Sequence, residues 1–245
     1  MSRRVRLAVF VPALGVFAAL LVWGLVGLPD FGHYVGPYGY LLDRVAVPER
    51  HVTNVVTAVV FDYRGFDTLG EEFILFTAVV GVVLLLRGDE PEAPELNDSI
   101  GSDLVRVGGV LAVGAALLVG LWLVAFGYLT PGGGFQGGVV VAAAALLVFL
   151  VSSYRDWEGI GSEHVLDPLE AVGAGGFVVI GLAALVSGMP FLTNLLGPGS
   201  TGTLRSGGSL PFLNWAVALE VSAALLVLFS EFLEEYVVPL AAESS

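Results

Sequence analysis

Long apolar runs separated by short polar segments dominate the chain. A helix that crosses the hydrocarbon core of a bilayer needs about 20 predominantly apolar residues. The pattern therefore predicts an all-α polytopic membrane protein with about six transmembrane helices. The predicted crossings are Leu7–Leu28, Val52–Arg87, Val105–Leu129, Val139–Ser153, Leu169–Met189 and Phe212–Phe232.

The second run is too long for one straight crossing. As a continuous helix it would extend about 54 Å, against about 30 Å of hydrocarbon. Gly65 and Gly70 are the candidate positions for a bend. We expect a main crossing over Phe66–Leu86, with Val52–Arg64 as a partly embedded leading arm; two short crossings are the alternative. Residues 29–51, which contain several Gly and Pro, are expected to form a polar loop.

An acidic segment with two prolines divides the chain after residue 90. Acidic residues combined with Pro are typical of a solvated connection. The sequence therefore predicts a module at 1–90 with two transmembrane helices, a linker at 91–103 and a module at 104–240 with four.

Composition and charge agree with a membrane protein. Mean hydropathy is +0.86 and only 13% of the residues are charged, which is outside the usual range of soluble domains. The net charge of -13 argues against nucleic-acid binding, which needs a basic surface. There is no Cys, so disulfides and thiolate metal sites are excluded.

The arginines indicate an orientation. With six crossings both termini lie on one side of the membrane, and six arginines fall on that side against three on the other, with Arg64 at membrane level. By the positive-inside rule the N- and C-termini are cytoplasmic. The six are Arg3, Arg4, Arg6, Arg87, Arg106 and Arg155; the three are Arg44, Arg50 and Arg205.

Four carboxylates and one arginine lie at the edge of the second run: Asp62, Arg64, Asp67, Glu71 and Glu72. Ionisable groups at membrane depth usually face a protein interior or a watery path. On a helix Asp67 and Glu71 share a face, whereas Glu72 points about 100° away. The cluster is consistent with an ion or proton path through the carboxylates. It is also consistent with an Arg64–Asp67 pair that only fixes the architecture.

Glu220 is a second candidate for this path, because it stands within the apolar run Trp215–Phe229. It could relay protons or make an interhelical hydrogen bond. The three histidines show no spacing typical of a metal site, and no nucleophile or redox motif is present. We therefore expect no metal, no cofactor and no enzymatic activity.

Residues 130–138 contain a formal G-x-G-x-x-G pattern. A dinucleotide site needs a strand before this pattern, but here an apolar helix precedes it. The segment instead predicts a tight turn packed against a neighbouring helix, with ion coordination by its carbonyl groups as the alternative. The residues of this packing turn are Pro131, Gly132, Gly133, Gly134, Gly137 and Gly138.

Two stretches carry a family resemblance. Residues 53–71 resemble the C-terminal module of the large A-type component in Mrp-type multisubunit sodium/proton antiporters, which also occurs as the small E-type component of related membrane-bound hydrogenases. The family core D-F-R-x-F-D-T-L/M-G-E has Tyr63 here where Phe is common, and Leu28–Gly32 also fits this module. Residues 129–138 resemble the B-type component of the antiporters, the MnhB family, with Tyr128 where a His often precedes the motif.

The resemblance implies one component of a large complex that exchanges Na+ for H+ in the cell membrane. Other antiporter subunits and the lipid bilayer would be its partners. Protons or Na+ would pass along the carboxylates from Asp62 to Glu72, assisted by Glu220. One alternative is an ion-translocating subunit of a hydrogenase-type redox complex; another is a purely structural scaffold.

Overall fold

The computed structural model describes residues 3–28, 36–86, 102–152 and 154–244. These residues form helices and no strand, which confirms the all-α prediction. The elements are α1 (Arg3–Val26), α2 (Pro37–Arg50), α3 (Val55–Ala58), the π-helix η1 (Val59–Tyr63), α4 (Gly65–Leu86), α5 (Asp103–Ala125), α6 (Gly134–Val151), α7 (Tyr154–Gly161), α8 (Glu163–Val186) and α9 (Leu210–Ser244).

Six of these helices, within the described residues, are long and apolar enough to cross a membrane. The prediction of a multi-pass membrane protein with six crossings is therefore confirmed. The spanning segments are Leu7–Val26, Gly65–Leu86, Asp103–Ala125, Gly134–Val151, His164–Val186 and Leu210–Leu233.

The prediction of a loop over 29–51 was wrong for its second half, where α2 forms. Pro37 occupies the start of the helix, where a missing N–H is tolerated. Leu42 and Ala46 are one turn apart and are both buried, so packing of this face stabilises the helix. Residues 29–35 and 87–101, including most of the predicted acidic linker, lie outside the described residues.

The chain breaks its helical path directly before α4. Asn54 caps α3 by accepting hydrogen bonds from the backbone N–H groups of Val56 and Thr57 at 3.1 and 3.4 Å. The wider π-helical turn η1 follows, and Arg64 leaves helical geometry at φ −129° and ψ 31°. α4 then starts at Gly65 and continues through Gly70 without interruption. A π-turn at this point sets the direction in which Asp62 and Tyr63 project.

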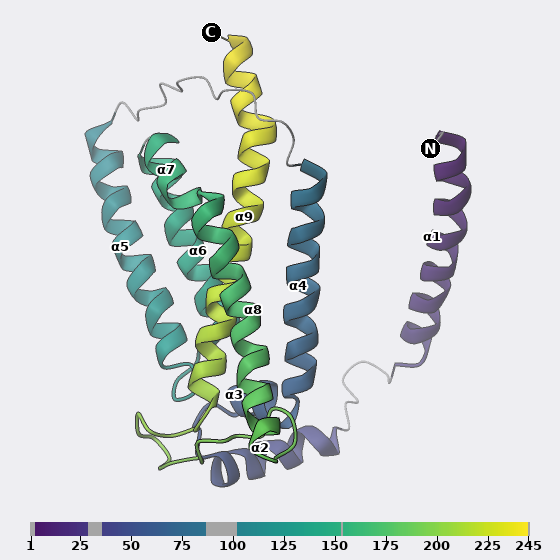
Figure 1. The fold of residues 1–245 in the computed structure, drawn as a ribbon, viewed down its shortest axis with the longest axis vertical. Helices are drawn as coiled ribbons and strands as arrows, with labels where there is room; N and C mark the ends of the chain where they lie inside the picture. Colours follow the sequence, from purple (N-terminus) through teal and green to yellow (C-terminus); the bar gives the residue numbers. More distant parts are fainter. Residues whose placement is uncertain (1–2, 29–35, 87–101, 153, 245) are drawn as a thin grey trace. The chain divides into compact units, whose positions relative to one another are not determined.

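Residues 1–41 and 42–245 form two separate compact units, and the candidate site lies in the second. Within the second unit α9 is the central helix and packs against α4, α6 and α8 (Figure 1). It is also the most buried spanning segment of the described chain, with 61% of its apolar 18-residue stretch inside the protein. Apolar contacts between Phe61, Phe177 and Val217 tie η1, α8 and α9 together.

The turn between α5 and α6 is held by side-chain amides. Asn214 of α9 accepts from the Gly134 backbone N–H at 2.7 Å and donates to the Val124 carbonyl at 3.1 Å. Asn54 donates to the Gly127 carbonyl at 2.6 Å and to the Thr130 carbonyl at 3.1 Å. Irregular backbone at membrane depth needs such internal partners. The turn is therefore fixed from both sides by residues distant in sequence.

Close helix approach at this turn requires glycine. A Cβ on Gly137 would lie 2.3 Å from Val124 Cγ2 and 2.9 Å from the Val124 nitrogen. A Cβ on Gly134 would lie 2.5 Å from the Asn214 carbonyl oxygen. These glycines let α6 begin in direct backbone contact with α5 and α9.

We predict that Gly137→Ala destabilises the protein by about 1–3 kcal/mol, because the added methyl group forces α5 and α6 apart. Gly114→Ala on α5 is the matched control, since nothing lies within 4 Å of its added Cβ. The measurement is the thermal unfolding midpoint of the purified membrane complex. Equal midpoints for the two variants would show that the close approach is unnecessary.

Candidate ion and proton site

A cavity of about 590 Å³ opens beside the helix break that precedes α4. Residues from α2, η1, the start of α4 and the loop after α8 surround it. The helical segments and the break before α4 contribute the charged and hydroxyl-bearing side chains of Glu49, Arg50, Asp62, Tyr63, Arg64 and Asp67. The loop contributes Phe191, Leu192, Thr193, Asn194 and Pro198.

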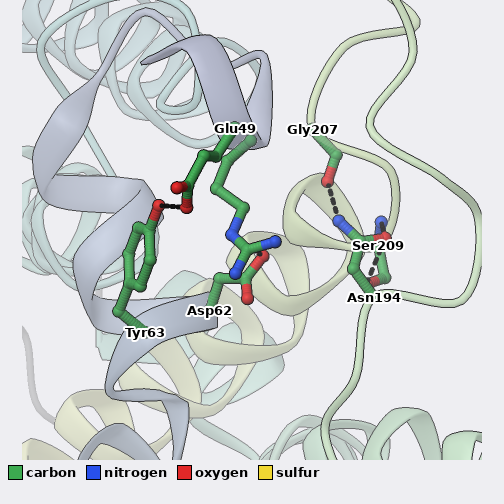
Figure 2. A network of polar contacts seen from close by, with 7 residues as sticks. Glu49, Asp62, Tyr63, Asn194, Gly207 and Ser209 are labelled. Carbon is green, nitrogen blue, oxygen red and sulfur yellow. Dashed lines mark hydrogen bonds and ion pairs between the residues drawn. The ribbon is translucent and has the colours of Figure 1, made fainter. Parts of the chain in front are cut away.

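An ion pair joins α2 to η1 in this cavity. Arg50 Nε lies 3.2 Å from Asp62 Oδ2, and the Arg50 guanidinium stacks 4.8 Å from the centre of the Tyr63 ring. The Tyr63 hydroxyl donates to Glu49 at 2.6 Å (Figure 2). Two acids, one cation and one phenol are therefore connected in a single polar network.

Burial shifts the titration of this network. It raises the pKa of Asp62, an effect that the Arg50 guanidinium opposes. Burial and the hydrogen bond to Glu49 together raise the pKa of Tyr63 to about 12. The phenol therefore stays protonated near neutral pH and can continue to donate to Glu49.

Asp67 and Glu71 lie on an exposed face of α4 in this chain. Asp67 pairs with Arg64, as the i, i+3 spacing predicts, and the two side chains are 50% and 58% exposed. In a membrane-spanning helix, charged side chains on the outside of one subunit need a protein or water neighbour rather than lipid. This face of α4 is therefore chemically unsuited to lipid.

Glu72 points the other way, into the protein. It is 1% exposed, and Glu220 of α9 is fully buried. The two carboxyl groups are neighbours, and none of their four oxygens has a hydrogen-bond partner in the described part of the chain. Two neighbouring ionised carboxylates in a low-dielectric interior repel strongly, so the pair needs a shared proton or a bound cation.

The described residues contain no group of three or more His, Cys, Asp or Glu side chains placed to hold a metal ion. The Gly127 and Thr130 carbonyls of the glycine turn already accept hydrogen bonds from Asn54. Thr57 also donates to the Gly127 carbonyl, at 2.7 Å. These two carbonyls are thus engaged by protein donors.

Comparison with known families accounts for the two halves of the chain. Residues 104–227 match the family described as a domain related to the MnhB subunit of Na+/H+ antiporters. The chain belongs to the MnhB family. Residues 2–101 match a second family, MbhE, described as the E component of MBH. The resemblance seen in the sequence, an MnhB part preceded by a module of this second type, is confirmed.

Two curated proteins are similar to this MnhB-family chain. An uncharacterized protein of Methanocaldococcus jannaschii is 31% identical over 86% of this chain and 88% of its own length. The probable A/B component of a K(+)/H(+) antiporter of Rhizobium meliloti is 31% identical over 63% of this chain. The match covers only 18% of that much longer protein.

Two solved structures share the fold. One is a chain of the membrane-bound sulfane sulfur reductase, an archaeal respiratory membrane complex. It has a TM-score of 0.70 and 29% identity, over 94% of this chain and 98% of that one. The other is a chain of the Mrp complex from Dietzia sp., with a TM-score of 0.65 and 24% identity. That match covers 94% of this chain and 26% of that one.

The buried carboxyl pair connects the two family-defined parts. Glu72 belongs to the part that matches MbhE, and Glu220 to the MnhB part. The contact between Asn54 and Gly127 bridges the same two parts. The fusion of the two modules therefore builds a shared polar interior that neither module contains alone.

The sequence did not predict Glu49, Arg50 or Glu170 as residues of the site. Arg50 was assigned to an outer loop, because the helix that carries it follows a Gly- and Pro-rich stretch. Glu170 lies near the start of its apolar run, where a carboxylate is expected at the interface, yet it is only 5% exposed. Its closeness to Glu220 depends on the tight helix contact at Gly173, which the sequence alone does not show.

We predict that Arg50→Gln destabilises the protein in a pH-dependent way. Without the Arg50 cation, nothing opposes the effect of burial on Asp62. The pKa of Asp62 in the folded protein therefore rises further above its value in the unfolded chain. Stability from such a group is complete below the unfolded pKa and is lost as the pH rises through the folded pKa. The destabilisation should therefore be small in acid and reach about 1–2 kcal/mol above that pKa, because the 35% exposure of Arg50 weakens the pair.

Thermal unfolding at a series of pH values measures this effect. The control is the double variant Arg50→Gln/Asp62→Asn, in which the Asp62 carboxylate is absent. The loss of stability of this double variant relative to wild type should not increase with pH, whereas that of Arg50→Gln should. A rise of the same size in both variants would contradict the assignment.

Proposed function

We propose that the chain is one component of a multisubunit monovalent cation/proton antiporter and contributes carboxylates to the ion or proton path. The observation that carries this proposal is the buried Glu72–Glu220 pair, which has no basic partner among the described residues. Buried ionisable groups inside a membrane protein are typical of transport paths. Membership of an antiporter-related family supports a transport role rather than an enzymatic one.

Na+ is the exchanged cation that we propose, following the family description. The similarity to a component of a K+/H+ antiporter makes K+ the second candidate. We place the protein in the cell membrane with both termini cytoplasmic, as the arginine distribution predicts.

The cavity is the proposed access point for the ion. Glu49, Asp62 and Asp67 give it a surplus of carboxylates over Arg50 and Arg64. Such a surplus attracts cations from water. From the cavity a proton or cation would move along α4 to the Glu72–Glu220 pair.

Asp67 and Glu71 are assigned to an interface with a neighbouring subunit. Both are exposed on a helix that otherwise presents apolar side chains such as Phe73 and Ile74. A partner that covers this face would supply the polar surroundings that lipid cannot. The ion path would then run partly between subunits.

A redox-driven ion pump is the second candidate function. The similarity to a chain of an archaeal sulfane sulfur reductase complex extends over 98% of that chain and favours this alternative. In both cases the chain would move ions, and only the energy source would differ. Dependence of proton flux on an imposed cation gradient, without any electron donor, separates the two.

We predict that Glu72→Gln and Glu220→Gln each reduce cation-driven proton exchange by about tenfold or more, because each removes an exchangeable proton from the buried pair. The assay is the dissipation of a pH gradient on cation addition, in everted vesicles that carry the complete set of subunits. Asp67→Asn/Glu71→Gln tests the interface carboxylates in the same way.

Assembly of every variant complex is checked by affinity purification of a partner subunit. Asp103→Asn is the matched control, because its carboxylate is 96% exposed and far from the pair in sequence. Normal exchange by the assembled Glu72→Gln and Glu220→Gln complexes would mean that the chain acts only as a scaffold.

A further inference from the structure

Glu170 is a third buried carboxylate that the proposed path does not yet include. It lies on α8 within the spanning segment His164–Val186 and is more than nine-tenths buried. No described residue donates a hydrogen bond to its Oε1 oxygen. An unsatisfied carboxyl oxygen in an apolar interior is costly, so a functional reason for it is expected.

Glycine brings Glu170 close to the buried pair. A Cβ on Gly173 would lie 2.4 Å from the Glu220 nitrogen and 2.7 Å from the Glu220 Cβ, so the backbones of α8 and α9 touch at Glu220. Glu170 is one turn before Gly173 on the same face of α8. This contact places the Glu170 carboxyl group near Glu220.

Glu170 lies farther along the bundle than the contact between α8 and α9 at Gly173. α8 runs antiparallel to α9 (Figure 1). Glu170 is therefore displaced by about 4–5 Å from Gly173 toward the C-terminal end of α9. Glu72, the carboxylate next to Glu220, is on α4, the helix that starts at the cavity. A path that follows α4 from the cavity would therefore reach Glu72 first, then Glu220 and then Glu170.

We propose that Glu170 is a proton-carrying residue that exchanges protons with Glu220 and extends the buried pair into a three-carboxylate relay. This inference rests on the proposed function and names a further residue of the same path. In each transfer the O–H bond of one carboxylic acid breaks as the O–H bond of the next forms. The donor becomes a carboxylate, the acceptor becomes neutral, and no electrons are exchanged.

A proton suits this arrangement better than a metal cation. A hard cation needs about six converging oxygens, whereas the carboxylates of the described residues form no cluster that could hold a metal ion. Among the described residues, the charged groups that face Glu170 are Glu220 on α9 and Asp167 on its own helix, and Glu72 is next to Glu220. A row of acids without a converging centre is adapted to transferring protons one step at a time.

The test uses the complete complex reconstituted in vesicles. We expect Glu170→Gln to slow cation-driven proton exchange by about tenfold, and Glu170→Asp to retain a slower exchange with an altered pH profile. Wild-type exchange should be slower in heavy water than in light water. Asp103→Asn is the control that should match wild type in rate, pH profile and isotope effect.

A wild-type rate and pH profile for assembled Glu170→Gln would overturn the relay. If Glu170→Gln does not assemble, Glu170→Asp decides: a wild-type rate, pH profile and isotope effect would assign Glu170 a structural role. Binding of radiolabelled sodium at fixed pH addresses the cation alternative. Loss of this binding in Glu170→Gln, with an unchanged isotope effect on the residual exchange, would make Glu170 a cation ligand and would also overturn the proposal.

The outcome is separable from failure of the proposed function. If wild-type complex shows no cation-driven exchange, the antiporter assignment fails whatever Glu170 does. If Glu220→Gln abolishes exchange while Glu170→Gln does not affect it, the antiporter role stands and the path ends at Glu220.

Discussion

Two asparagines satisfy the irregular backbone on which this fold depends. The chain leaves helical geometry before α4 and again between α5 and α6, and lipid offers no partner for the polar groups that such breaks release. Asn54 both caps α3 and donates to carbonyls of the α5–α6 turn, whereas Asn214 links that turn to α9. A residue at the first break thus supplies hydrogen bonds to the backbone of the second break.

This mutual arrangement determines where the carboxylates lie. Because α3 and η1 are fixed to the glycine turn, α4 starts in a defined position and packs on α9. That packing turns Glu72 toward Glu220 and leaves Asp67 and Glu71 outside. Gly173 then allows α8 to approach α9 closely enough for a third carboxylate. Small residues at these helix contacts therefore allow close packing and also bring carboxylates near one another.

The sequence predicted the elements that depend on local pattern. Hydrophobic run lengths gave the six crossings, and helical periodicity placed Asp67 and Glu71 on one face, away from Glu72. It could not show which face is buried, because that depends on α9, about 150 residues away in the chain. α2 was missed because its stability comes from burial of Leu42 and Ala46 rather than from local propensity.

The distribution of positive charge distinguishes the cavity from the interior. Arg50 and Arg64 neutralise Asp62 and Asp67 at the mouth, within reach of water. In the described interior no arginine accompanies Glu72 or Glu220. A fixed guanidinium there would neutralise the carboxylates permanently, so they would not need to bind a proton or a cation. Without one, the interior stays neutral only while protons or cations occupy it. In the proposed function, the transported proton or cation would supply this positive charge.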